Sequence, residues 1–345
     1  MPSLLQNERW LQWVEQLVES SSPETKGEEL PRSQFYCLLD DQPDHLAPPH
    51  SLSKWIPQDS AGHMMVNPSL SFAADSVIAG AGPSDASLLR NFALPHSVVW
   101  VGDPASDVLY PFWLGTKLRA LVCGLQPGRP APALSPEIHS LLTTAGILVP
   151  EDWELRRHKW LTATAQRAEA FQRNRYVPIP NLLHPFHIAA LRRYYRHMVR
   201  NGGMKYGDSQ APRRFFAYNE SVAQYFHSQW TGIVSAIVGE PVKPSYVYVA
   251  CYQEGADLAK HLDREQCEFS ITMCLDYTPE PRTCTPWPLM LQTAGGTASV
   301  FQALGDALLY RGREVPHWRE PLRLGNTSSS IFFHYVRKDF NGHLG

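Results

Sequence analysis

The sequence predicts an α+β protein in which a β-barrel or β-sandwich near the C-terminus packs on helices. Helical periodicity fills most of residues 153–239, whereas short alternating apolar runs separated by Gly and Pro follow Pro244. A chain of 345 residues is also too long for one comfortable hydrophobic core, so two domains are expected. We place an N-terminal α/β accessory domain at residues 1–160 and the β-rich domain with its helices at residues 161–345.

The overall composition is that of an ordinary globular protein. Hydrophobic residues make up 43% and charged residues 19% of the chain, and the formal net charge is −2. Without a basic excess, neither nucleic acid nor an anionic membrane is an expected partner. No run approaches the roughly 18–20 apolar residues of a membrane span, and the N-terminus lacks the pattern of a secretory signal. The six cysteines show no CxxC spacing, which favours buried thiols in a cytoplasmic protein. The oligomeric state does not follow from these numbers.

The first 150 residues carry weaker signals. An amphipathic helix is expected at the start of the chain from the spacing of Trp10, Trp13, Val14 and Leu17. Within residues 107–150 the pattern is strand, helix, helix, strand, with Ser135 as a helix N-cap and Gly146 as a helix stop. This order is similar to a small winged-helix or peptide-binding module, and a plain support between domains is the alternative interpretation.

The middle of the chain is predicted to be mostly helical. Apolar positions recur at helical spacing, and Gly residues end the segments. The expected elements are helices at 153–175, 185–203 and 220–239, a strand at 176–183, and a polar, arginine-bearing loop at 202–219. Further strands are expected at 245–252, 268–277, 297–303, 307–312 and 328–336.

The strongest chemical signal is the sequence His261-Leu262-Asp263 within the β-rich region. Residues i and i+2 of a strand point to the same face, so His261 and Asp263 can address one point inside a barrel. His317 lies further along, at the start of another predicted strand. Two histidines and one carboxylate on one face of a metal leave positions open, which is the pattern of oxygen-activating iron(II). A solvent-exposed pair beside Arg264 is the alternative for the HxD motif alone.

With these residues in view, the stretch from about Tyr176 to Phe340 resembles the 2-oxoglutarate/iron(II) dioxygenase superfamily, most nearly its prolyl-hydroxylase-like and phytanoyl-hydroxylase-like branches. The resemblance rests on Tyr252 before the Gly255 turn, the triad His261, Asp263 and His317, and the run Gly305-Asp306-Ala307-Leu308-Leu309. It implies a double-stranded β-helix (jelly-roll) core with a helical buttress. It also implies iron(II), 2-oxoglutarate and O2 as reactants, with ascorbate as a candidate reductant.

One departure from that family concerns the co-substrate anchor. Relatives carry Arg or Lys on the last core strand to pair with the distal carboxylate of 2-oxoglutarate, and here that window reads Thr327-Ser328-Ser329-Ser330. A buried dicarboxylate needs a cation, and a guanidinium fits it best. We expect Arg319, which shares the inward face with His317, and name Arg311 as the second choice. The hydroxyl donors expected beside it are Tyr252, Thr272, Ser328 and Ser330.

The expected reaction is hydroxylation of an unactivated carbon, because halogenating relatives lack the carboxylate that Asp263 supplies. We expect the substrate to be a residue in a peptide or a carrier-bound group. The alternatives are a free amino acid or small metabolite, and a non-catalytic binding module on an oxygenase fold. Expected substrate contacts are Arg213, Arg214 and Tyr218 on a flap, and Arg264 at the rim. His334, Trp287 and Trp318 are expected to be core or packing residues.

Overall fold

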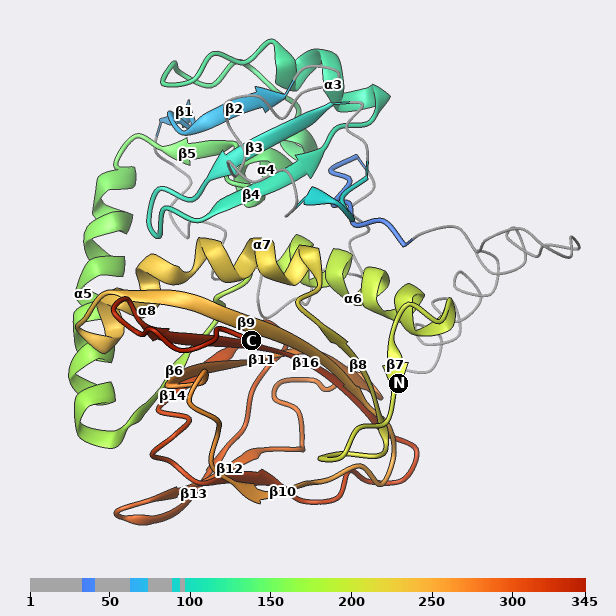
Figure 1. Ribbon diagram of the computed structural model, residues 1–345. Coiled ribbons are helices and arrows are strands. Elements are labelled where there is room, and N and C mark those ends of the chain that lie inside the picture. Colours follow the sequence, from blue (N-terminus) through green and yellow to red (C-terminus); the bar gives the residue numbers. More distant parts are fainter. Residues whose placement is uncertain (1–32, 41–62, 74–88, 94–96) are drawn as a thin grey trace, which may run out of the picture. The chain divides into compact units, whose positions relative to one another are not determined.

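Two antiparallel sheets face each other in the C-terminal half of the computed structural model (Figure 1), which describes residues 33–40, 63–73, 89–93 and 97–345. The larger sheet has the order β6-β14-β11-β16-β9-β8-β7 and the smaller one the order β10-β15-β12-β13. The strands of the larger sheet are β6 (Tyr176–Ile179), β14 (Ala307–Tyr310), β11 (Phe269–Thr278), β16 (Thr327–Arg337), β9 (Val242–Tyr252), β8 (Arg214–Tyr218) and β7 (Lys205–Tyr206). Those of the smaller sheet are β10 (Leu258–His261), β15 (His317–Arg319), β12 (Leu289–Thr293) and β13 (Gly296–Val300).

The connectivity of these strands is that of a jelly roll. From β9 onward the chain passes between the sheets at nearly every step, with β9, β11, β14 and β16 in the large sheet and β10, β12, β13 and β15 in the small one. Such double-sheet closure satisfies most strand edges. The predicted jelly-roll core is therefore confirmed, and β12 is a strand that the sequence did not predict.

The two faces of the large sheet differ in chemistry. On β11, Ile271 and Met273 are fully buried in the main hydrophobic core, whereas Ser270 and Thr272 alternate toward the small sheet. A separate apolar cluster closes the space between the sheets, formed by Leu289, Leu291, Leu308, Tyr310 and Val315. The interior of the barrel is thus apolar at one side and lined by hydroxyl groups at another, which is where a site can form.

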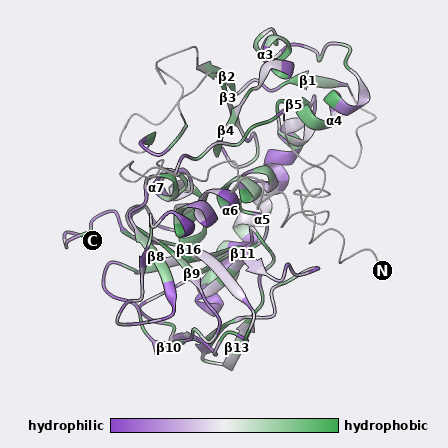
Figure 2. Cartoon of the chain, turned by 90° about the vertical axis from the view of Figure 1, so that its right-hand side faces the viewer, coloured by the Kyte–Doolittle hydropathy of each residue, from purple (hydrophilic) through white to green (hydrophobic). Residues whose placement is uncertain are grey.

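Helices cover the outer face of the large sheet (Figure 1). They are α5 (Trp153–Asn174), α6 (Pro185–Arg200), α7 (Ser221–Gln229) and α8 (Thr231–Val238). Helix α6 carries hydrophilic beside hydrophobic residues (Figure 2) and buries its apolar side. Its Arg192 and Arg196 bind Asp276 of β11, with Arg192 Nε 2.9 Å and Arg196 Nη2 2.7 Å from Oδ1. These ion pairs fix the helical buttress to the barrel.

Two expectations for the helical region are wrong in detail. The expected loop at 202–219 contains β7 and β8, because β8 pairs with β9 from Arg214↔Tyr252 to Tyr218↔Tyr248. The expected single helix at 220–239 is two helices, since Trp230 takes a non-helical conformation between them. Trp230 is fully buried, so the break lets its large ring enter the core.

Preceding α5, a separate set of short elements occupies the described residues from 63 to 150. It comprises β1 (Met64–Val66), β2 (Leu70–Ala73), β3 (Val98–Gly102), β4 (Leu109–Trp113), α3 (Thr116–Cys123), α4 (Pro136–Thr144) and β5 (Leu148–Pro150). The expected order of strand, helix, helix, strand is confirmed, and Ser135 accepts a hydrogen bond from Ile138 N as an N-cap. Strand β5 pairs with β1 and β4 with β3.

The expected domain boundary at residue 160 lies inside α5, and the division into two domains stays a prediction. The winged-helix interpretation of residues 107–150 also stays a prediction. The helix expected around Trp10 lies outside the described residues. Among the described helices, none is long and apolar enough to cross a membrane.

Candidate metal centre

The three predicted metal ligands meet between the sheets. His261 is the last residue of β10, and His317 is the first residue of β15. The two histidines lie opposite each other in the antiparallel pairing of these strands. Asp263 lies just beyond the end of β10, where its backbone N–H donates to the carbonyl of Gly312 at 2.9 Å. Asp263 Oδ1 is 3.6 Å from Nε2 of His261 and 3.6 Å from Nε2 of His317. The triad therefore converges on one point.

Hydrogen bonds on the far side of each imidazole set its orientation. His261 Nδ1 is 2.8 Å from the carbonyl of Ala259, and His317 Nδ1 is 3.0 Å from the carbonyl of Val315. A carbonyl only accepts, so Nδ1 carries the proton and the lone pair of the neutral ring lies on Nε2. Two imidazole lone pairs and a carboxylate oxygen then face one another, an arrangement that a divalent cation satisfies. Two N donors and one O donor on one face suit Fe(II).

The surroundings keep Asp263 ionised. Burial raises the pKa of this carboxyl, but the hydrogen bond with His261, the charges of His334 and His317 and the hydroxyl of Ser270 lower it to about 2. Burial lowers the pKa of His317. The pKa of His261 is raised, because its contact with Asp263 outweighs the effect of burial. An ionised carboxylate is the state that a metal ligand requires.

Arg319 lies deeper in the barrel on the same inward face as His317. Its side chain is 4% exposed, its Nη1 donates to the carbonyl of Trp287 at 2.6 Å, and its guanidinium lies 4.6 Å from the Trp287 ring centre. Burial lowers its pKa, and the neighbours that oppose this effect are Tyr252, Cys274 and Tyr310. In the described part of the chain no carboxylate pairs with this cation. A buried guanidinium without a carboxylate partner is costly, and a bound anion would stabilise it.

Hydroxyl groups without hydrogen-bond partners lie on the strands beside Arg319. Thr272 Oγ1, Ser330 Oγ and Arg319 Nε are buried and make no hydrogen bond within the described residues. Ser328 alternates with Ser330 on β16 and pairs in register with Tyr252, which is fully buried. Buried polar atoms are normally satisfied, so these three unpaired groups fit a polar ligand. All five predicted co-substrate residues other than Arg311 thus lie on the inner faces of β9, β11 and β16 in the large sheet and of β15 in the small one.

Arg311 has a different environment. Its guanidinium lies 5.4 Å from the ring centre of Phe171 on α5 and 5.3 Å from that of Phe269, and its Nη1 is 3.2 Å from Glu314 Oε1. This cation is already neutralised and faces α5. The structure therefore favours Arg319 over Arg311 as the anchor for a dicarboxylate.

The predicted substrate residues separate into two groups. Arg264 Nη2 donates to the Tyr246 hydroxyl at 2.9 Å, and the ring of Tyr218 stacks on that of Tyr246 at 5.0 Å. Tyr246 also lies 4.5 Å from the His334 ring, so Arg264 and Tyr218 belong to the rim near Asp263. Arg214, in contrast, is buried and bound to Asp208 at 2.6 Å. The expected role of Arg214 as a free clamp is corrected, because its charge is neutralised inside the fold.

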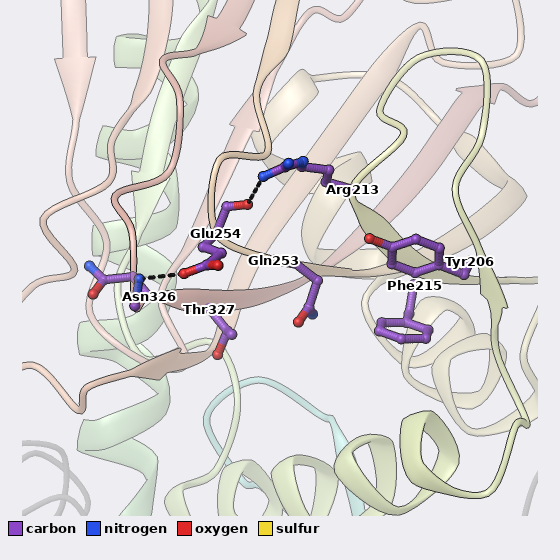
Figure 3. Close-up of a pocket in the computed structure, with 8 residues that line it drawn as sticks. Tyr206, Arg213, Phe215, Gln253, Glu254, Asn326 and Thr327 are labelled. Carbon is purple, nitrogen blue, oxygen red and sulfur yellow. Dashed lines mark hydrogen bonds between the residues drawn. The ribbon is translucent and has the colours of Figure 1, made fainter.

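Arg213 lines a pocket at the other end of the barrel (Figure 3). The pocket has a volume of about 580 Å³ and its lining is Tyr206, Arg213, Phe215, Gln253, Glu254, Gly325, Asn326 and Thr327. Thr327 begins β16, whereas His334 near the triad lies seven residues along it, roughly 23 Å at about 3.3 Å per residue. The pocket is therefore separate from the metal centre, and Arg213 does not face the triad.

Sequence reasoning missed two residues that touch the triad. Ser270 Oγ donates to Asp263 Oδ2 at 2.8 Å, and the Tyr310 hydroxyl lies 3.4 Å from His317 Nε2. Ser270 alternates with the predicted Thr272 between the apolar residues Phe269, Ile271 and Met273 of β11, so this alternation is a signal that could have found it. Tyr310 carries no such signal, since a tyrosine in a strand is ordinary packing.

Comparisons with known proteins find similar proteins among solved structures only. No family model matches the sequence, and no curated protein matches it. Among solved structures the chain is similar to a Pseudomonas putida prolyl-4-hydroxylase, at 17% identity over 51% of this chain and 99% of that one, with a TM-score of 0.42. It is also similar to a Trichoplax adhaerens prolyl hydroxylase in complex with a hypoxia-inducible-factor peptide, at 15% identity over 55% and 95%, TM-score 0.46.

A third similar structure is HygX from Streptomyces hygroscopicus with nickel, 2-oxoglutarate and hygromycin B bound, at 12% identity over 51% of this chain and 88% of that one, TM-score 0.42. The similar structures include prolyl hydroxylases, an α-ketoglutarate-dependent epimerase and a protein with 2-oxoglutarate bound. At these identities and TM-scores the function has to be argued from the residues of this chain.

Proposed function

We propose that this protein is an Fe(II)- and 2-oxoglutarate-dependent oxygenase that hydroxylates an unactivated C–H bond. One observation carries the proposal. Strand β15 presents His317 and Arg319 on the same inward face, so a metal ligand and an unpaired buried cation stand two residues apart. A dicarboxylate that reaches from the metal to Arg319 satisfies both.

The residues predicted for the metal and the co-substrate each have a defined role in this proposal. His261, Asp263 and His317 hold the iron, and Arg319 pairs with the distal carboxylate of 2-oxoglutarate. Thr272, Ser330 and Ser328 donate hydroxyl hydrogen bonds, and Tyr252 closes the space beside them. Bound iron(II) and 2-oxoglutarate, with O2, supply the oxidising chemistry, and ascorbate serves as reductant. The protein orients the target bond and excludes water through the apolar cluster around Leu291.

We further propose that the substrate is a residue in a peptide or a carrier-bound group, which approaches over the rim. Its support is the cation Arg264 with Tyr218 and Tyr246 beside Asp263, a surface that can bind an extended substrate by hydrogen bonding and stacking. A free amino acid or small metabolite is the second candidate. A cytoplasmic location stays part of the proposal, supported by six cysteines that show no CxxC spacing.

Succinate formation tests the proposed activity. Purified protein is given iron(II), ascorbate, O2 and 2-oxoglutarate, and succinate is measured with and without candidate substrates. We expect turnover, uncoupled turnover included, in the wild type and none in His261→Ala. His343→Ala is the matched control, because this histidine is exposed and outside the triad. Absence of both turnover and iron binding in the wild type would favour a non-catalytic binding module.

A further inference from the structure

A second group of metal-ligating side chains adjoins the triad. One ligand atom from each of Asp263, Cys267 and His334 lies within 4.8 Å of the other two. Cys267 is 1% and His334 6% exposed, so the group is buried. Across the described part of the chain, this group and the triad are the two that meet such a criterion. We propose that Asp263, Cys267 and His334 form a zinc site that shares its carboxylate with the iron triad.

The carboxylate of Asp263 has one oxygen for each site. Oδ1 faces the two triad imidazoles, whereas Oδ2 accepts from Ser270 Oγ at 2.8 Å. The same Ser270 oxygen is 2.9 Å from His334 Nδ1. A cation bound by Asp263 and His334 replaces this single hydroxyl bridge.

Cys267 is held close to the same point. Its backbone N–H donates to the Arg264 carbonyl at 2.9 Å, which turns the chain back just after Asp263. Its Sγ lies 3.0 Å from the Tyr246 hydroxyl, and the Tyr246 ring packs against His334. The thiol and the imidazole therefore both lie beside Tyr246, with their ligand atoms within 4.8 Å of the Asp263 carboxylate, and Tyr246 or water is available as a fourth ligand.

The donor set determines which cation fits. A thiolate and a carboxylate carry two negative charges, which balance one divalent cation inside the protein. One sulfur, one nitrogen and one oxygen donor suit tetrahedral Zn²⁺, whereas the two nitrogens and one oxygen of the triad suit Fe(II). The ordinary alternative is that Cys267 and His334 are packing residues. Packing alone does not explain why the sulfur, the imidazole and the carboxylate lie close together.

Sharing of Asp263 has a functional consequence. Two divalent cations on one carboxylate repel each other in a buried setting, so zinc in the second site weakens iron in the first. Zinc then inhibits the enzyme without occupying the triad. This consequence rests on the proposed oxygenase function, but zinc binding itself does not.

Cobalt(II) is the probe for the binding test, because cobalt–thiolate bonds absorb in the near ultraviolet and a triad without sulfur gives no such band. The full-length, metal-free chain carrying His261→Ala is titrated with Co²⁺. We expect one equivalent to give the thiolate band, and Zn²⁺ to displace it. Adding Cys267→Ser should remove the band and weaken Zn²⁺ binding more than about tenfold, whereas the buried control Cys251→Ser keeps both.

Two outcomes overturn the proposal: no thiolate band in His261→Ala, or a band that persists after Cys267→Ser. His334→Asn provides a second variant if Cys267→Ser fails to fold, and it must also weaken the band. The fold-inhibition of succinate formation by added zinc should be smaller in Cys267→Ser than in the wild type. If the thiolate band is absent from His261→Ala and the wild type forms succinate, only the proposed zinc site is rejected. If the thiolate band is present and the wild type forms no succinate, only the proposed oxygenase function is rejected.

Discussion

The anchoring of 2-oxoglutarate by Arg319 gives the sharpest prediction of a single substitution. Removing one partner of a buried, hydrogen-bonded charge pair costs about 2–5 kcal/mol, so Arg319→Gln should weaken 2-oxoglutarate binding roughly 30- to 4,000-fold at about 1.4 kcal/mol per tenfold. Iron binding should persist, because the substitution leaves His261, Asp263 and His317 in place. The matched control is Arg311→Gln, whose cation pairs with Glu314 and faces α5.

The free protein gives an independent readout of the same substitution. Arg319 is buried without a carboxylate partner in the described part of the chain, and desolvation of such a cation costs several kcal/mol. The carbonyl of Trp287 and its ring recover only part of that cost. The free energy of unfolding without co-substrate should therefore not fall in Arg319→Gln.

Calorimetric titration of 2-oxoglutarate into the Mn(II)-loaded protein, together with urea unfolding, measures both quantities. An unchanged affinity in Arg319→Gln would refute the assignment. A loss of affinity in Arg311→Gln instead would transfer the role to Arg311.

Three further predictions follow from the metal centre and the buried histidines. In Gly312→Ala the new Cβ would collide with Asp263 Oδ2 and the Cys267 carbonyl. The iron affinity, measured by titration, should therefore fall more than about tenfold. An unchanged iron affinity would contradict the site geometry. Mn(II) at 100 times its dissociation constant should raise the free energy of unfolding by about 2.7 kcal/mol, and a chelator should reverse this increase. An equal increase in His317→Ala would argue against the triad as the metal site. Burial lowers the pKa of His184 to about 4 and of His227 to about 3, so below pH 6.5 the unfolded chain binds more protons than the folded one. The free energy of unfolding is then highest above pH 6.5 and falls as the pH decreases toward 4 and 3, by about 2 kcal/mol per histidine at pH 5. Urea unfolding at pH 7 and pH 5 should show a smaller loss of this free energy in His227→Asn than in the wild type. An equal loss would show that this histidine does not contribute.

The metal triad could be predicted because its information is local and ordered along the chain. His261 and Asp263 stand two residues apart, and His317 opens a short strand that a turn separates from β14. Strand alternation explains only part of this arrangement, since β10 ends at His261 and Asp263 is placed by its hydrogen bond to Gly312. The three residues do come together as expected, with a different structural reason for the position of Asp263, and their role as iron ligands stays a prediction.

Other features depend on tertiary contacts that local patterns do not encode. Strands β7 and β8 are short, with two and five residues, and they form because β8 pairs with the edge of β9 and β7 pairs with β8. The break at Trp230 depends on where its ring packs, which helical periodicity cannot show. Cys267 and His334 are far apart in sequence and meet only through the pairing of β11 with β16, so their cluster with Asp263 could not be predicted.

The most direct measurement of the central claim is whether iron and 2-oxoglutarate bind at the same place. Under nitrogen, 2-oxoglutarate added to the iron(II)-loaded protein should give a visible metal-to-ligand charge-transfer absorption, because both must be in contact for it to arise. We expect this absorption in the wild type, its loss in His261→Ala, and its appearance in Arg319→Gln only at much higher 2-oxoglutarate concentrations. No absorption in the wild type, or an equal absorption in His261→Ala, would contradict it.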